Sequence, residues 1–325
     1  MNTEHITAET QSPLLVDSPV VFHIGWMRTG TTFLQGVFKK QENIQLSLKN
    51  RFISYNPYYS LGREHYRTLV EGSDQHQVVI DSDENYAMGR FKTHLRKKNQ
   101  QRSYNYKAEL SFVYHDIPEM LSRMKEMSPN AKILGVIRKQ ADWFESVYKH
   151  DVYHFGLDQT FEKFYQSNLG QAYRNAADYS GIIASFQQAF GKDNVKILLF
   201  EDFIQDQQKF VKNLSDFLEV DILVGEKKSL KKNASTSGLI THLHRMANTL
   251  AEPDPRRPER KLYQTLRTAI YKLDRIAATS GWKLSGKALS TAMQQRISRD
   301  FAASNEKLIE IIGDEALLKR YQYIK

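Results

Sequence analysis

The residues best suited to binding a ligand lie between an apolar run and a helical pattern near the start of the chain. Residues 25–32 read Gly-Trp-Met-Arg-Thr-Gly-Thr-Thr, with four residues between the two glycines. The apolar run at residues 20–24 predicts a buried strand, and the apolar spacing at residues 33–38 predicts a helix. A glycine-containing turn between a strand and a helix can surround a phosphate with backbone N–H groups, helped by the helix dipole. We therefore predict a phosphate-binding loop.

This loop departs from the pattern that binds nucleoside triphosphates. In that pattern a lysine follows the second glycine, whereas this chain has Thr31 there and carries its basic residue, Arg28, inside the turn. A loop without that lysine suits a single phosphate held by backbone amides, hydroxyls and a guanidinium. The predicted phosphate ligands are therefore Arg28, Thr29, Gly30, Thr31 and Thr32.

A second cation follows the clearest strand pattern of the chain. Residues 132–137 read Lys-Ile-Leu-Gly-Val-Ile, Arg138 comes directly after them, and Ser146 lies eight residues further on. Ligands of open α/β sheets bind at the carboxyl ends of the strands. We therefore expect Arg138 to face the same ligand as the loop.

The motifs resemble those of sulfotransferases that use 3′-phosphoadenosine 5′-phosphosulfate (PAPS). Residues 28–35, Arg-Thr-Gly-Thr-Thr-Phe-Leu-Gln, resemble the family's 5′-phosphosulfate loop, with arginine in place of the usual lysine. The strand that ends in Arg138, followed by Ser146, resembles the family's 3′-phosphate site. Residues 231–236 resemble a basic loop that returns to the 3′-phosphate, which would add Lys232 and Asn233. The end of the chain resembles the tail of bacterial carbohydrate sulfotransferases.

The resemblance implies in-line transfer of a sulfuryl group from PAPS to a hydroxyl or amine of an acceptor, leaving 3′,5′-adenosine bisphosphate (PAP). Arg28 would stabilise the leaving phosphate, and no metal is expected. The acceptor is expected to be a saccharide or polysaccharide, which suits the positive charge of the chain. We expect no nucleic-acid partner, no integral membrane contact and a cytoplasmic location.

Three residues are candidates for the base that deprotonates the acceptor. Glu84 comes first, because it follows the strand pattern at residues 77–81 and could face the cofactor. Glu109 comes second: Lys107 and Glu109 resemble the Lys-x-His pair of cytosolic sulfotransferases, and side chains two residues apart on a strand point the same way. Lys107 could then hold the sulfuryl oxygens. His94 matches that pair more literally but lies outside any apolar run, so it comes third.

Composition excludes several classes of protein. The 325 residues include no cysteine, which removes disulfides, thiol catalysis and cysteine-zinc sites. No apolar stretch approaches the ~18 residues of a membrane span, and the first residues lack the features of a secretory signal. The net charge of +9 indicates an anionic ligand without identifying it.

Strand patterns alternate with helix patterns, which predicts an α/β protein. We expect a P-loop-type three-layer fold with a central, mostly parallel sheet and a helical C-terminal extension. Residues 1–18 are expected to form a flexible tail and residues 19–325 a single domain, in which 226–300 form a mostly helical insertion on the acceptor side. Strands are predicted at residues 20–24, 77–81, 104–110, 132–137 and 195–200, and residues 90–103 are predicted to be a basic helix or loop. Amphipathic helices are predicted at residues 117–127 and at about 304–318.

Two other functions remain open at this point. The first is a P-loop ATP-dependent kinase or nucleotidase, in which Glu201 and Asp202 after a strand pattern could hold Mg²⁺; the missing lysine argues against it. The second is a non-enzymatic nucleic-acid-binding protein that uses the basic segments at 90–102 and 226–261. It would bind with a steep dependence on salt, but no helix-turn-helix, zinc-finger or RNA-recognition pattern supports it.

Overall fold

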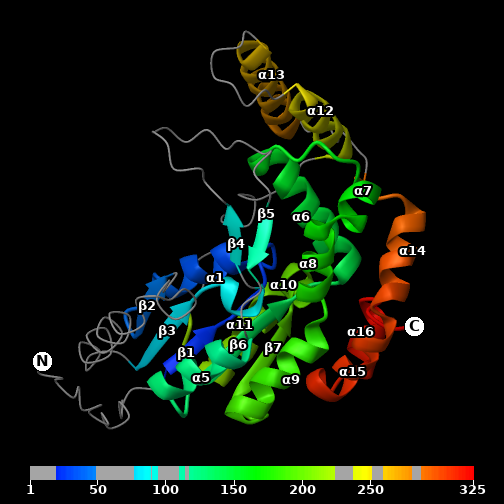
Figure 1. Cartoon of the computed structure of the whole chain (residues 1–325). Coiled ribbons are helices and arrows are strands. Elements are labelled where there is room, and N and C mark those ends of the chain that lie inside the picture. The colour runs from blue at the N-terminus through cyan, green and yellow to red at the C-terminus, as the bar shows by residue number, and fades with distance from the viewer. Residues whose placement is uncertain are drawn as a thin grey trace, which may run out of the picture.

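The core of the protein is a five-stranded parallel sheet with the strand order β2-β3-β1-β6-β7 (Figure 1). A computed structural model of the chain describes residues 20–48, 77–88, 90–93, 110–113, 117–223, 237–250, 259–279 and 287–325. The strands of the sheet are β1 (Val20–His23), β2 (Ile44–Leu48), β3 (Val78–Ser82), β6 (Lys132–Ile137) and β7 (Val195–Leu199).

Helices cover both faces of this sheet, because neighbouring residues of each strand point into different cores. Val20 and Phe22 of β1 pack in one core with α5 (Ile117–Met127), α6 (Gln140–Phe155) and α9 (Tyr179–Phe190). Val21 packs in the other core with α1 (Thr31–Phe38) and α11 (Gln207–Leu218). The predicted three-layer α/β fold is confirmed.

The direction in which strands are added to the sheet changes at β1. After β1 the chain builds β2 and β3 on one side, and it then crosses to build β6 and β7 on the other side. In open α/β sheets the ligand crevice forms at such a switch point, outside the carboxyl ends of the strands. The segments that follow β1, β6 and β3 carry Arg28, Arg138 and Glu84, so the topology brings these three residues to one end of three adjacent strands.

The regular elements described in the C-terminal part, from residue 237 onward, are all helices. Two helices, α12 (Gly238–Thr249) and α13 (Glu259–Thr279), pack together as a hairpin beyond the end of α6 (Figure 1). The chain then forms α14 (Thr291–Asp300), α15 (Ala302–Ile312) and α16 (Glu315–Arg320), and α15 packs against α9. The remaining helices are α4 (Asn85–Met88), α7 (Phe161–Gln166), α8 (Asn168–Ala176) and α10 (Phe200–Gln205).

One prediction about the middle of the chain was wrong. Residues 90–93, expected to be helix or loop, form β4 (Arg90–Thr93), which pairs antiparallel with β5 (Leu110–Val113). A short strand is stabilised by a distant partner, and its own sequence carries too little periodicity to show it. β2 was missed for the same reason. Of the strand predicted at 104–110, only residue 110 lies in the described ranges, and the rest stays a prediction.

No helix in the described ranges combines the length and the apolar character that crossing a bilayer requires.

Candidate active site

The loop between β1 and α1 has a backbone that only certain residues tolerate. Gly30 adopts φ of 89°, where a residue with a side chain is strained, and a Cβ there would lie 3.3 Å from the ring of Phe200. Gly25 is required for another reason, because a Cβ there would lie 2.9 Å from Nε2 of His23. Arg28 itself has φ of 66°, an uncommon value for a residue with a side chain, and such values cluster at functional sites.

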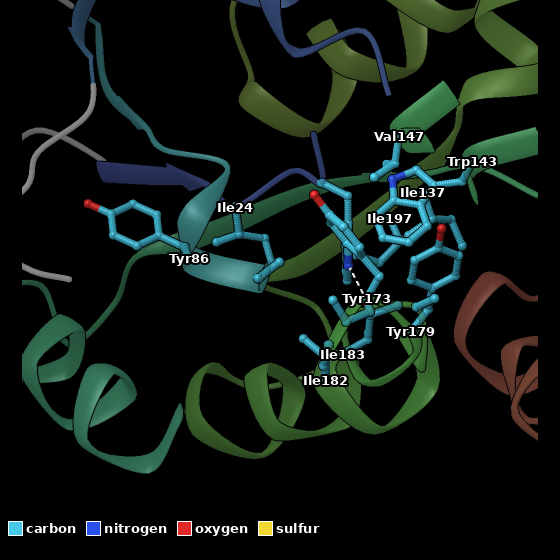
Figure 2. Close-up of a cluster of buried hydrophobic side chains, with 14 of the residues drawn as sticks. Ile24, Tyr86, Ile137, Trp143, Val147, Tyr173, Tyr179, Ile182, Ile183 and Ile197 are labelled. Carbon is cyan, nitrogen blue, oxygen red and sulfur yellow. Dashed lines mark hydrogen bonds between the residues drawn. The ribbon is translucent and has the colours of Figure 1, made fainter. Parts of the chain in front are cut away.

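Buried aromatic residues hold this loop from below. The indole Nε1 of Trp26 donates to the carbonyl of Ala176 at 2.6 Å, and that of Trp143 donates to the carbonyl of Met27 at 2.8 Å. Figure 2 shows Trp143 beside Tyr173 and Tyr179 in the same cluster. The loop is therefore fixed by Trp143 of α6, by the Ala176 carbonyl of α8 and by Tyr179 of α9, whose ring packs on Trp26, although all three are distant in sequence.

The first turn of α1 is open to an anion. Its N-cap, Gly30, offers no side-chain hydrogen bond to the helix, and no acidic residue lies in the turn. The first N–H groups of an α-helix have no partner within the helix and carry the positive end of its dipole. This helix start can therefore bind a phosphate, as the loop motif predicts.

The three threonines of the loop differ in their surroundings. The hydroxyl of Thr29 donates to the carbonyl of Trp26 at 2.5 Å, and the hydroxyl of Thr31 donates to the same carbonyl at 3.4 Å. Both side chains are buried, whereas Thr32 is exposed. The Thr29 and Thr31 hydroxyls thus fold the turn onto itself, and direct contact with a phosphate stays a prediction for all three threonines.

The guanidinium groups of Arg28 and Arg138 lie within electrostatic range of each other beside the loop. Nε of Arg28 donates to Oγ of Ser146 at 3.1 Å, and Nη1 of Arg138 donates to the backbone carbonyl of Arg28 at 3.3 Å. The Arg138 guanidinium also lies over the ring of Phe200, 4.8 Å from its centre. Burial and the neighbouring Arg138 lower the pKa of Arg28, whereas Glu84 and the carboxylate of Asp151 act in the opposite direction. The predicted residues Arg28, Arg138 and Ser146 are thus brought together.

Glu84 lies close enough to this group to act on it electrostatically. It follows β3 and is half-buried, and its charge raises the pKa of Arg28. The other base candidates, Glu109 and His94, lie outside the described residues, as do Lys107, Lys232 and Asn233. Their predicted roles stay predictions.

The carboxylates that a kinase would need have other partners. Glu201 accepts hydrogen bonds from the backbone N–H of Lys139 at 2.9 Å and from the hydroxyl of Tyr323 at 3.0 Å. Asp202 accepts one from the hydroxyl of Tyr321 at 2.8 Å. Glu201 and Asp202 therefore hold Tyr323 and Tyr321, near the C-terminus, against the segment that follows β7. Among the described residues no group of three histidine or carboxylate side chains is arranged to hold a metal ion.

The sequence reasoning missed two residues on α6 beside this group. Asp151 is buried, and it interacts with Nδ1 of His150 at 3.1 Å and with the hydroxyl of Tyr173 at 2.9 Å. Burial raises the pKa of Asp151, while His150, Tyr173 and Arg28 oppose that rise. One signal was available, because His150 lies one helical turn after Ser146 and therefore on the same face of the predicted helix.

Comparisons with known proteins agree with the motifs. A family model described as "Sulfotransferase family" matches residues 19–223, more than half of the chain. No curated protein matches the chain in sequence. Among solved structures, a sulfotransferase from Alicyclobacillus acidocaldarius is 18% identical, with 86% of this chain and 100% of that chain covered and a TM-score of 0.49.

Two further structures are similar to this chain. Mouse sulfotransferase SULT7A1 complexed with PAP is 14% identical, with 94% of this chain and 87% of that chain covered and a TM-score of 0.42. The sulfotransferase domain from the curacin biosynthetic pathway is 14% identical, with 78% and 98% covered and the same TM-score. All three scores are below 0.5, so family membership rests on the family model. The chain belongs to the sulfotransferase family.

Proposed function

We propose that this protein transfers a sulfuryl group from PAPS to a hydroxyl of a saccharide acceptor. The observation that carries the proposal is the meeting of two arginines beside an uncapped helix start. Arg28 and Arg138 come from loops after adjacent strands, and Nη1 of Arg138 contacts the Arg28 carbonyl at 3.3 Å. Two cations next to each other repel, and an anion between them offsets that repulsion. PAPS carries phosphates at both the 5′ and 3′ positions of its ribose and so suits this pair.

Each predicted ligand has a part in this binding. The start of α1 and Arg28 bind the 5′-phosphate side, where negative charge develops on the leaving oxygen during transfer. Arg138 and Ser146 bind the 3′-phosphate, and Lys232 and Asn233 join them if the resemblance of their loop holds. When bound, PAPS supplies the activated sulfuryl group. The protein orients that group and offsets its charge with fixed cations.

A carboxylate base is part of this proposal, and Glu84 is its first candidate. Its electrostatic effect on Arg28 supports a place beside the transferred group. If Glu84 is the base, Glu84→Gln lowers turnover by about 100-fold, within the range for a lost general base, and leaves PAP affinity nearly unchanged. Undiminished turnover would remove Glu84 from this role and leave Glu109 with Lys107, or another group.

The acceptor side is proposed from the position of the C-terminal helices. The hairpin of α12 and α13 packs against the C-terminal end of α6, and Ser146 lies near the middle of the same helix. A saccharide acceptor that reaches the loop along α6 would pass this hairpin, which supports assigning the stretch at 226–300 to the acceptor. The proposed location in the cell is the cytoplasm.

Thermal unfolding with nucleotides tests the donor. We expect PAP to raise the midpoint more than ATP, ADP or 5′-AMP at equal concentration, without magnesium, because only PAP supplies the 3′-phosphate that Arg138 would bind. Incubation with labelled PAPS and a panel of desulfated glycans then tests the acceptor. An equal response to 5′-AMP would remove the 3′-phosphate assignment, and a larger response to ATP with magnesium would favour the kinase.

A further inference from the structure

A histidine and a buried carboxylate lie beside the phosphate loop and have no part in the proposed binding of PAPS. They are His150 and Asp151, consecutive residues of α6. His150 follows Ser146 by one helical turn, so the two lie on the same face of the helix. Arg28 hydrogen-bonds to Ser146 and acts electrostatically on Asp151. The pair therefore lies within range of the cation that would face the leaving phosphate.

The hydrogen bonds of Asp151 fix the orientation of the imidazole. Nδ1 of His150 lies 3.1 Å from one carboxylate oxygen, and the hydroxyl of Tyr173 donates to the other at 2.9 Å. The Asp151 side chain is almost completely buried, so these partners are held in place. A carboxylate accepts hydrogen bonds, so Nδ1 of a neutral His150 carries the proton and Nε2 keeps its lone pair.

Two titratable side chains of the same helix, Asp151 and His154, contact His150. Arg28 of the loop acts electrostatically on both of them, and Tyr173 of α8 hydrogen-bonds to Asp151. The rings of His150 and His154 are 4.7 Å apart. Burial, together with His150 and Arg28, lowers the pKa of His154 to about 4, so His154 is neutral at pH 7 and does not oppose a proton on His150.

We propose that His150, oriented by Asp151, is the base that takes the proton of the acceptor hydroxyl. This inference rests on the proposed function and differs from it in one respect, the identity of the base. The carboxylate of Glu84 interacts with the positive charge of Arg28. A guanidinium nearby stabilises the charged carboxylate and so makes it a weaker base. A neutral imidazole held by a buried carboxylate is a base suited to neutral pH. In this arrangement Glu84 holds Arg28, and Asp151 is a positioning residue.

The proton and electron pairs balance as follows. The acceptor hydroxyl gives its proton to Nε2 of His150 while its oxygen forms a bond to sulfur. The bond between sulfur and the bridging oxygen of the 5′-phosphate breaks, and its electron pair stays on that oxygen, where Arg28 offsets the charge. The imidazolium, stabilised by Asp151, then returns its proton to water.

His150→Gln tests the proposal, because glutamine can hydrogen-bond but cannot take the proton. Release of labelled sulfate from PAPS, with water as the acceptor, is expected to fall about 100-fold. PAP affinity, measured by calorimetry, should stay within twofold. The control is Lys192→Gln, an exposed residue before the start of β7, at the opposite end of the sheet from the loop, which should keep both values. A rate within threefold of the parent protein would overturn the proposal.

The tautomer of His150 gives a readout that needs no acceptor. Nitrogen-15 shifts of the full chain at pH 7.5, assigned with His150→Gln, should show a protonated Nδ1 and a bare Nε2. Asp151→Asn should change this pattern and lower the rate, and Asp151→Glu should restore part of both. A proton on Nε2 would contradict the inference. Failure of the parent protein to bind PAP would instead contradict the proposed function, and it would leave the tautomer result intact.

Discussion

The two ends of α6 meet two regions that are built in opposite ways. At its start, Trp143 and Ser146 contact a loop whose supporting side chains are buried aromatics. At its end, α6 meets the hairpin of α12 and α13, where Asn248 donates to the carbonyl of Val152 at 2.8 Å. Most of the exposed large apolar side chains in the described ranges lie on this hairpin: Leu239, Met246, Leu250, Leu262, Tyr271, Leu273 and Ile276.

Because of this difference in packing, the two regions suit different substrates. A phosphate-binding loop must keep its N–H groups fixed, and close packing beneath it provides that rigidity. The hairpin packs on the end of α6 and exposes large apolar side chains, so those exposed residues can vary without disturbing the sheet. The rigid region therefore suits a constant donor, and the exposed region suits whichever acceptor the protein uses.

The largest effect is expected for Trp143→Ala. The side chain is fully buried, and its indole N–H holds the Met27 carbonyl of the loop. Its removal leaves a cavity and an unpaired carbonyl, and is expected to cost about 3–5 kcal/mol in the free energy of unfolding, measured with urea. Trp143→Phe should cost less, because it keeps most of the packing. A loss of less than about 1 kcal/mol in the free energy of unfolding would mean that the loop does not depend on the packing of Trp143.

The next effect is a loss of stability in acid, because each region contains a buried neutral histidine. Burial lowers the pKa of His23, beneath the loop, from 6.5 to about 4. The unfolded chain then binds more protons between these values, so stability falls as the pH drops from about 6.5 to about 4. The full loss is about 3 kcal/mol below that range. Burial and Arg267 lower the pKa of His244, on α12, to about 4, with the same sign.

Urea unfolding at pH 7.5 and pH 4.5 measures this effect. His23→Gln should make the protein less sensitive to acid, because glutamine takes no proton. His244→Gln should have the same effect, because burial lowers the pKa of His244 to about 4 as well. An acid sensitivity that is unchanged in His23→Gln would show that this histidine is not neutral in the folded protein.

A smaller effect, confined to the donor site, is expected for Arg138→Ala. It removes the guanidinium but keeps the backbone carbonyl that accepts from the hydroxyl of Tyr179 at 2.8 Å. PAP binding, measured by calorimetry, should weaken about 10- to 100-fold, as expected for a lost charged hydrogen bond, and the folding midpoint should barely change. Arg138→Lys should bind with intermediate affinity. A large loss of stability would instead identify Arg138 as a structural residue.

The same contrast explains what could be predicted from the sequence. The strand before Gly25, the loop and the position of Arg138 were found because each rests on contiguous residues with a clear pattern. α5 was predicted with its observed bounds for that reason. The helix expected at 304–318 was not, because Gly313, with φ of 74°, divides it into α15 and α16.

The rest depends on contacts between distant residues. Nothing in the loop motif shows that the hydroxyls of Thr29 and Thr31 turn inward, or that Trp143 holds the loop. The pairing of His150 with Asp151 matters only because α8 brings Tyr173 to the same carboxylate. Such relations appear when helices pack, and one sequence does not contain them as a pattern.

The smallest effect is expected on the outer face of the hairpin. Ile276 is 58% exposed, so Ile276→Ala should change the free energy of unfolding by no more than about 0.5 kcal/mol. The matched variant on the inner face is Asn248→Ala. Asn248 donates to the carbonyls of both Val152 and Leu157, so its loss should cost about 1–3 kcal/mol. If Ile276→Ala lowers the free energy of unfolding as much as Asn248→Ala does, the outer face is covered in solution and cannot be open to the acceptor. Equal losses would contradict the contrast between a rigid donor region and an exposed acceptor region, whereas a clearly smaller loss for Ile276→Ala would support it.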